Sequence, residues 1–336
     1  KRVIKLSSNE NPYGASPKAI ELLETKNINH DLHRYPEIDG SSLREAIAKN
    51  FSIDSNRIIL GSGSDEVLLF AALAFCQDGD EILHANHGFE MYSIVSKVVG
   101  AVPKKIKEDV NFNLNIENLI DQTNDATKVI YIASPNNPTG TYLSRDQLVK
   151  LMNSISKNII VVIDGAYVEY VQKDDYDKGF SLTDEYENII LTRTFSKTYG
   201  LAALRVGWCY TSQKIADIIN KIKPPFNTTT ISQSLAIKAL EDKEHIENSV
   251  KLNSEIKDWF EKELKLLNIK TRQTEGNFTL IETSEEEAEK ISNHLMNDGI
   301  IIRRLNSYNL PNFLRISIGT KEEMNLTVES LKKFNV

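Results

Sequence analysis

Ile159-Ile160-Val161-Val162-Ile163-Asp164 is the segment from which the architecture can be worked out. Its first five residues are all β-branched and apolar, which is typical of a strand buried on both faces of a sheet. The run ends in a carboxylate, and a carboxylate buried without a positive partner costs several kcal/mol. We therefore expect Asp164 to meet a cation at the carboxyl end of a buried strand; capping of a following helix is the alternative.

Similar short apolar runs flank this segment on both sides, and amphipathic stretches such as Asp65–Phe75 and Ser144–Ser156 separate several of them. Buried strands that alternate with helices predict an α/β fold whose mostly parallel central sheet carries helices on both faces. Ligands of such sheets bind at the carboxyl ends of the strands. The other strand candidates are Arg57–Leu60, Glu81–Ala85, Lys128–Ala133, Asn188–Thr192 and Val206–Thr211.

The pattern changes after Pro224-Pro225, where a long helical pattern covers Ile231–Leu267. Strands and helices that follow it predict a smaller α+β C-terminal domain. We expect an N-terminal arm of residues 1–34 that packs on the small domain, a large domain of residues 35–235 and a small domain of residues 236–336. The predicted C-terminal elements are strands Asn277–Glu282, Ile300–Leu305 and Phe313–Ile318, with helices Ser284–Asp298 and Lys321–Phe334.

Composition excludes several classes of function. The 336-residue chain is 40% hydrophobic and carries a formal charge of −7, and it has no basic stripe, so nucleic acid is not expected as a partner. Cys76 and Cys209 form neither a disulfide framework nor a metal-ligand pattern, which favours a reducing cytoplasm and no metal site. No apolar run is long enough for a membrane span. No signal peptide is visible, although the chain begins at Lys1 rather than at a methionine.

Gly61-Ser62-Gly63-Ser64-Asp65 follows a predicted strand and opens a predicted helix. Ser64 can cap that helix, and free backbone N–H groups at a helix N-terminus favour a phosphate. A simple capped turn is the alternative. Glu66 stands where a dinucleotide fingerprint needs its third glycine, and the Lys-Ser/Thr pair of a P-loop is absent.

Ser134-Pro135-Asn136-Asn137-Pro138-Thr139-Gly140 ends another strand with two prolines and a glycine. A rigid polar turn at that place can hold an amide with little loss of entropy, so Asn137 could donate to a phenolate oxygen of a ligand. A structural asparagine in a turn is the alternative.

Lys197 lies in Thr194-Phe195-Ser196-Lys197-Thr198-Tyr199-Gly200, and Arg205 follows on the same segment. Lysine is the residue that bonds covalently to the aldehyde of pyridoxal phosphate. Thr194, Ser196 and Arg205 would then be positioned for the phosphate of that cofactor. A basic loop that happens to contain serine and lysine is the alternative.

Taken together, these segments resemble those of the fold-type-I pyridoxal-phosphate-dependent aminotransferases, and more narrowly those of the histidinol-phosphate aminotransferases. The resemblance runs from Ile4 to the last helix. It implies that Lys197 is the catalytic lysine, with Asp164 and Tyr167 beside it as catalytic residues. It also implies that Tyr35 reaches the cofactor phosphate of a neighbouring subunit, so that a homodimer shares its active sites. The implied cofactor-binding residues are Ser64, Asp65, Phe89, Asn137, Asp164, Tyr167, Thr194, Ser196, Lys197, Arg205 and Tyr35.

The resemblance also suggests a substrate. Arg315 lies in an apolar strand and requires an anion if buried. With Arg303 it would receive the phosphate of histidinol phosphate, or the carboxylate of glutamate in the half-reaction that uses 2-oxoglutarate, and Tyr13 would close over the substrate. Arg304 has no assigned role. A broad aromatic-amino-acid aminotransferase, a decarboxylase of a phosphorylated amino acid and a non-catalytic sensor are the alternatives.

Two positions depart from the family pattern: His87-Gly88 precedes Phe89, and Gly165 follows Asp164 where the family usually has glutamate.

Overall fold

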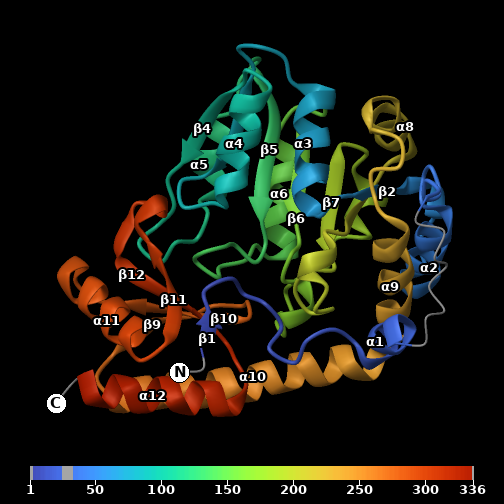
Figure 1. The fold of residues 1–336 in the computed structure, drawn as a ribbon. Helices are drawn as coiled ribbons and strands as arrows, with labels where there is room; N and C mark the ends of the chain where they lie inside the picture. The colour runs from blue at the N-terminus through green and yellow to red at the C-terminus, as the bar shows by residue number, and fades with distance from the viewer. Residues whose placement is uncertain (1–2, 25–32, 335–336) are drawn as a thin grey trace.

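Two β-sheets lie one above the other, with the N-terminal arm running between them and a long helix beneath (Figure 1). The computed structural model describes residues 3–24 and 33–334. The larger sheet has seven strands and the smaller has five.

The larger sheet has the strand order β2-β8-β7-β6-β5-β3-β4. Only β8 runs antiparallel to its neighbours, so the predicted mostly parallel sheet is confirmed. The sequence did not predict β4, because this edge strand contains a proline and two lysines instead of an apolar run. The strands are β2 (Ile58–Gly61), β3 (Glu81–Ala85), β4 (Val102–Ile106), β5 (Thr127–Ala133), β6 (Ile160–Asp164), β7 (Ile189–Thr194) and β8 (Gly207–Thr211).

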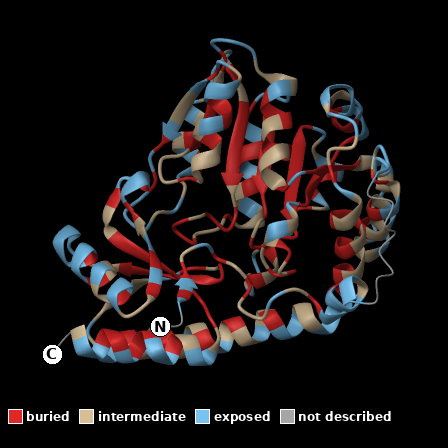
Figure 2. Ribbon diagram, in the orientation of Figure 1, coloured by how far each residue is buried: buried red, intermediate tan, exposed pale blue. Residues whose placement is uncertain are grey.

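Helices cover both faces of this sheet, and the alternation of side chains along each strand shows why. Val162 packs beneath α3 (Ser64–Phe75), α4 (Glu90–Val98) and α8 (Gln213–Ile222). Its neighbours Val161 and Ile163 belong to the opposite cluster, which contains α5 (Ile116–Asp121), α6 (Arg145–Ser154) and α7 (Leu182–Glu185). Period-two alternation between two apolar faces explains why every residue of β6 is buried. Figure 2 shows the inner strands of this sheet as buried.

The small sheet has the order β1-β11-β12-β10-β9. The N-terminal arm supplies β1 as a parallel partner of β11. The sequence predicted neither β1 nor β9, which are three-residue strands and too short for a period-two pattern to register. The elements are β1 (Ile4–Leu6), β9 (Lys270–Arg272), β10 (Phe278–Glu282), β11 (Ile300–Leu305) and β12 (Leu310–Ser317), packed with α11 (Glu285–Asn297) and α12 (Lys321–Phe334).

The single helical pattern predicted over Ile231–Leu267 is wrong, because the chain forms α9 (Thr230–Leu240) and α10 (Lys243–Leu266) instead. Asp242 separates them. Its carboxylate accepts hydrogen bonds from the backbone N–H of His245, at 3.4 Å, and from Ser16 Oγ, at 2.6 Å. The side chain therefore caps a new helix and ties it to the N-terminal arm.

Helix α9 packs on α1 (Pro17–Glu24) and α2 (Ser41–Phe51) at the β2 side of the large sheet. The division predicted at residues 235 and 236 falls inside α9. We propose the break at Asp242 as the place where the large unit passes into the small one.

Residues 1–2 and 25–32 of the predicted arm lie outside the described residues. The short 3₁₀ turns are η1 (Ser55–Arg57), η2 (Val168–Tyr170), η3 (Ala202–Leu204) and η4 (Asn306–Tyr308).

None of the helices that the structure describes is long and apolar enough to cross a membrane.

Candidate active site

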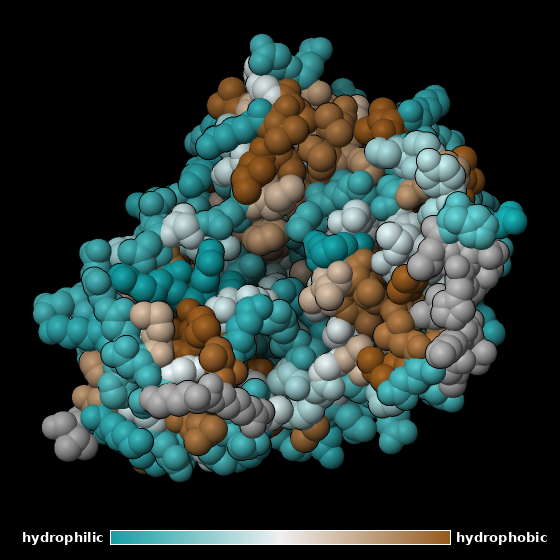
Figure 3. All heavy atoms as spheres, in the orientation of Figure 1, coloured by the Kyte–Doolittle hydropathy of each residue, from teal (hydrophilic) through white to brown (hydrophobic). Residues whose placement is uncertain are grey.

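A cavity of about 250 Å³ opens at the carboxyl edge of the large sheet, and Figure 3 shows the molecule hollowed near the centre of this face. The parallel strands β2, β3, β5, β6 and β7 all end at this edge, and the antiparallel β8 begins there, so segments far apart in the chain converge. Of the predicted residues, the cavity is lined by Ser64, Asp65, Phe89, Asn137, Asp164, Tyr167, Thr194, Ser196, Lys197 and Arg205.

One corner of the cavity is built for an anion. Arg205 Nη1 donates to Ser196 Oγ at 3.3 Å, and Arg205 Nη2 donates to Asp65 Oδ2 at 3.2 Å. Ser64 is the first residue of α3 and Gly63 is its N-cap, so the predicted capping role of Ser64 is wrong. The backbone N–H groups of that first turn have no partners within the helix, and together with Arg205 they suit a phosphate.

Asp164 forms the floor of the cavity. It is the last residue of β6, is 4% exposed, and caps no helix. Burial raises the pKa of its carboxyl group above the ordinary value, while hydrogen bonds from Thr192 and Tyr92 oppose that shift. A carboxylate held in this way can accept a hydrogen bond from a protonated ring nitrogen.

Asn137 and Tyr167 each keep a hydrogen-bond donor group available for a ligand. Arg315 Nη1 donates to Asn137 Oδ1, and because a guanidinium can only donate, the amide nitrogen of Asn137 remains a donor. The hydroxyl of Tyr167 accepts from Asn9 Nδ2 at 3.0 Å, so its own proton is free to be donated elsewhere. Both donors suit a phenolate oxygen.

Lys197 enters the cavity from the loop that follows β7. Its Nζ lies 5.8 Å from the centre of the Tyr167 ring and donates to the carbonyl oxygen of Ser8 at 2.9 Å. The N-terminal arm thus reaches the predicted catalytic amine. Ser8 and Glu10 of the arm also line the cavity, whereas the sequence analysis had placed only Tyr13 of the arm at the substrate.

Asn9 anchors the arm in place. It is 1% exposed, and its backbone N–H donates to Ser317 Oγ at 2.8 Å. Asn277 Nδ2 donates to the carbonyl oxygen of Asn9 at 2.9 Å. The sequence analysis assigned no role to Asn9, because its partners Ser317 and Asn277 lie 308 and 268 residues away in the chain.

Gly200 allows the arm to approach the Lys197 loop, and we expect Gly200→Ala to lower the free energy of unfolding by about 2–4 kcal/mol. The residue has φ +69°, and an added Cβ would lie 2.9 Å from Ala15 Cα and also overlap Gly14. Urea unfolding measures the effect. Gly79→Ala is the matched control, since Gly79 has φ +84° but nothing within 4 Å of the added Cβ. Equal losses for both variants would show that the contact with the arm contributes nothing.

Arg315 lies beside the cavity and is 5% exposed. Besides Asn137, it donates through Nη2 to the carbonyl oxygen of Ser7 at 2.7 Å. Its Nε is buried without a hydrogen-bond partner, and the described part of the chain offers it no carboxylate within ion-pair distance. Burial lowers the pKa of this guanidinium. A buried cation with donors to spare indicates an anionic ligand.

Comparison with known proteins now agrees with this geometry. The family model "Aminotransferase class I and II" matches residues 1–331. The chain belongs to this aminotransferase family. It is 40% identical to the histidinol-phosphate aminotransferase of Dinoroseobacter shibae over 333 residues, which cover 99% of this chain and 91% of the relative. It is 39% identical to the enzyme of the same name from Roseobacter denitrificans, covering 98% of this chain and 91% of that relative.

A solved structure confirms the fold of the aminotransferase. Histidinol-phosphate aminotransferase from Sinorhizobium meliloti, in complex with pyridoxal-5′-phosphate, superposes with a TM-score of 0.92 at 23% identity. The superposition covers 100% of this chain and 92% of that one. The predicted large sheet with helices on both faces and the predicted smaller C-terminal unit are therefore confirmed.

Four predicted residues of the aminotransferase are not among the residues that line the cavity: Arg315, which lies beside it, and Arg303, Tyr13 and Tyr35. Arg303 Nη2 is 3.8 Å from Glu90 Oε2, and Tyr13 packs against the core of the small unit. Tyr35 is 80% exposed and stacks on Phe226, with ring centres 4.6 Å apart. Their functional roles stay predictions.

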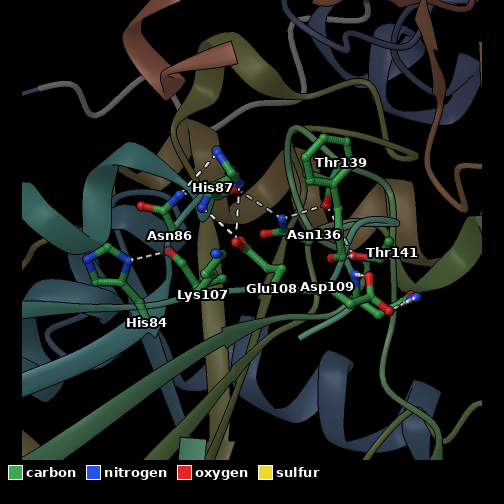
Figure 4. Close-up of polar contacts among 12 residues, drawn as sticks. His84, Asn86, His87, Lys107, Glu108, Asp109, Asn136, Thr139 and Thr141 are labelled. Atoms are coloured by element: carbon green, nitrogen blue, oxygen red, sulfur yellow. Dashed lines mark hydrogen bonds and ion pairs between the residues drawn. The ribbon is translucent and has the colours of Figure 1, made fainter. Parts of the chain in front are cut away.

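His87 contacts Glu108 in this chain (Figure 4). Its backbone N–H donates to Glu108 Oε1 at 2.8 Å, and its Nδ1 lies 3.2 Å from Glu108 Oε2. Asn136 Nδ2 donates to the carbonyl oxygen of His87 at 3.0 Å. These contacts among His87, Glu108 and Asn136 join the loops after β3, β4 and β5. They hold the segment that presents Phe89 to the cavity.

Gly165 is explained by Arg193. An added Cβ at Gly165 would lie 2.9 Å from Arg193 Cζ and 2.6 Å from Val168 Cγ1. Arg193 is 4% exposed, and its guanidinium donates to the carbonyl oxygens of Thr192 and Lys178. The space that a longer side chain would need after Asp164 is thus already filled.

Proposed function

We propose that this chain is a pyridoxal-phosphate-dependent aminotransferase that transfers the amino group of L-histidinol phosphate to 2-oxoglutarate, giving imidazole-acetol phosphate and L-glutamate in histidine biosynthesis. The observation that carries the substrate assignment is buried Arg315, a guanidinium without a carboxylate partner among the described residues. The names of relatives near 40% identity support the same substrate.

The residues of the cavity fit the proposed cofactor group by group. Arg205, Ser196 and the first turn of α3 suit its phosphate. Asp164 suits its ring nitrogen, and the donors of Asn137 and Tyr167 suit its 3′-oxygen. Phe89 lines the cavity as the ring that would stack on it. When bound, pyridoxal phosphate withdraws electrons from the substrate α-carbon.

Lys197 supplies the amine that holds the cofactor and then acts as the base for the substrate. The flexible side chain places Nζ in the cavity beside Tyr167. In this proposal Nζ would also take the proton from the α-carbon of the substrate. Asp164 keeps the ring nitrogen protonated, and the carbonyl oxygen of Ser8 orients the Lys197 amine.

The arginines near the cavity would orient the two substrates. Arg315 lies opposite Arg303 in the pairing of β11 with β12, so two cations stand on adjacent strands. A phosphate can use both, whereas a lone carboxylate can be held by one guanidinium in a bidentate contact. Arg315 would receive the phosphate of histidinol phosphate in one half-reaction and a carboxylate of glutamate in the other.

Stopped-flow absorbance of the cofactor-loaded protein tests this substrate assignment. We expect rapid loss of the absorbance of the lysine-bound cofactor with L-histidinol phosphate and little change with L-phenylalanine, because phenylalanine lacks the phosphate. Comparable conversion by phenylalanine would favour a broad aromatic aminotransferase. Release of CO₂ from a phosphorylated amino acid would favour a decarboxylase.

We also propose that the enzyme is a cytoplasmic homodimer. Tyr35 is 80% exposed, stacks on Phe226 and does not line the cavity of its own chain. An aromatic ring exposed to this extent suits a protein–protein interface. Tyr35 would then contribute its hydroxyl to the cofactor phosphate of the partner subunit.

A further inference from the structure

Both carboxylate oxygens of Asp164 are held by hydroxyl groups from separate elements. Tyr92, on α4, donates its phenolic O–H to Asp164 Oδ2 at 2.9 Å. Thr192, on β7, donates its Oγ1–H to Asp164 Oδ1 at 2.9 Å. Two donors on opposite oxygens fix the plane of the carboxylate.

Tyr92 carries its hydroxyl into an apolar cluster, where the hydroxyl donates its hydrogen bond to Asp164. The side chain is 1% exposed and belongs to the apolar cluster beneath α3 and α4. Its ring stacks on Tyr131 with centres 4.9 Å apart and planes 5° apart, and it meets Phe89 edge-on at 5.9 Å. Phenylalanine would fill the same space, and a buried hydroxyl is costly unless it is hydrogen-bonded.

The geometry points to Tyr92 as a positioning residue that acts through Asp164: its O–H holds the carboxylate ionised and aimed at the cavity, so that a proton shared with the cofactor's ring nitrogen stays on the ring. This inference rests on the proposed pairing of Asp164 with that nitrogen. Tyr92 touches neither substrate nor cofactor in this account.

The physical basis is a competition for one proton. Burial disfavours the charged form of Asp164, whereas donated hydrogen bonds favour it. If a donor is lost, the carboxylate becomes more basic and draws the proton away from the ring nitrogen. The ring then loses the positive charge that makes it an electron sink.

Tyr131 provides a matched control. It is also a buried tyrosine, 1% exposed, in the same cluster and stacked on Tyr92. Its hydroxyl donates to the carbonyl oxygen of Leu68 at 2.7 Å and not to Asp164. Tyr92→Phe and Tyr131→Phe each remove one buried hydroxyl and keep the stacked rings, so a general loss of stability would affect both alike.

The experiment compares the purified holoenzymes of Tyr92→Phe, Tyr131→Phe and Thr192→Val. The measurements are the pH dependence of the bound cofactor's absorbance, the dissociation constant of pyridoxal phosphate titrated into the apoenzyme, and kcat and KM. For Tyr92→Phe we expect kcat to fall roughly 10- to 100-fold with KM little changed, the range set by one hydrogen bond to a charged group. The cofactor should bind more weakly, and its absorbance should titrate at a shifted pH.

Thr192→Val should resemble Tyr92→Phe, whereas Tyr131→Phe should keep the wild-type titration and kcat. The inference is overturned if Tyr92→Phe and Tyr131→Phe give the same titration and the same kcat. Asp164→Asn separates this failure from failure of the proposed function. If Asp164→Asn weakens cofactor binding and turnover while Tyr92→Phe does not, the assignment of Asp164 stands and only the role of Tyr92 is wrong.

Discussion

Lys197→Ala lowers the rate of amino-group transfer by at least about 10⁴-fold, and the protein still binds pyridoxal phosphate. Lys197 supplies both the covalent attachment to the cofactor and the base for the α-carbon proton in the proposed reaction. Its removal therefore eliminates two functions of one amine. The groups at the phosphate corner, Arg205 and Ser196, remain in place and should keep the cofactor bound noncovalently.

Single-turnover absorbance with L-histidinol phosphate measures this loss, and ultrafiltration measures retained cofactor. Lys214→Ala is the control, because Lys214 is an exposed lysine on α8 that is not among the residues lining the cavity. Addition of a small primary amine should restore part of the rate if the missing group is the base. Full activity of Lys197→Ala would refute the assignment of the site.

Arg315→Ala lowers kcat/KM for L-histidinol phosphate by roughly 10²- to 10³-fold, the range for losing one side of a buried, hydrogen-bonded charge pair. The same change should weaken the binding of 2-oxoglutarate, since one guanidinium is proposed to serve both half-reactions. Most of the effect should appear in KM, because Arg315 binds the part of the substrate that does not react.

Steady-state kinetics with each substrate varied in turn test this expectation. Arg304→Ala is the neighbouring control: Arg304 pairs with Glu289 at 3.8 Å and lies opposite Leu314 in the strand pairing. The thermal stability of both variants should be measured as well, because Arg315 also donates hydrogen bonds to Asn137 and to the Ser7 carbonyl oxygen. A fall in stability with unchanged kinetics would mean that Arg315 is structural.

The chemistry-bearing residues could be predicted because their signals are local. Asp164 ends an unbroken β-branched run, Asn137 stands between two prolines, and Lys197 lies among small and hydroxyl-bearing residues. In a parallel sheet, the ends of neighbouring strands meet at one edge. Local pattern and that rule together place these residues in one cavity, as the structure has them.

Other predictions failed where a distant contact determines the local conformation. The helical pattern after residue 230 continues through Asp242, yet that side chain caps a new helix because Ser16 of the arm binds it. Serine is a common N-cap residue, but Ser64 is already the first residue of α3 and Gly63 is its N-cap. Strand β1 forms only because β11 lies beside it.

By itself, the sequence determined the α/β class, most strands of the large sheet, and the identity of most residues that line the cavity. Each depends on contacts between near neighbours or on the period of apolar side chains. Only the tertiary structure decided that Tyr92 and Thr192 hold Asp164, that Asn9 and Ser8 bring the arm to Lys197, and that Arg193 fills the space beside Gly165. These contacts join residues that are mostly far apart in the chain, and their hydrogen-bond geometry exists only once the two sheets and the arm are packed together.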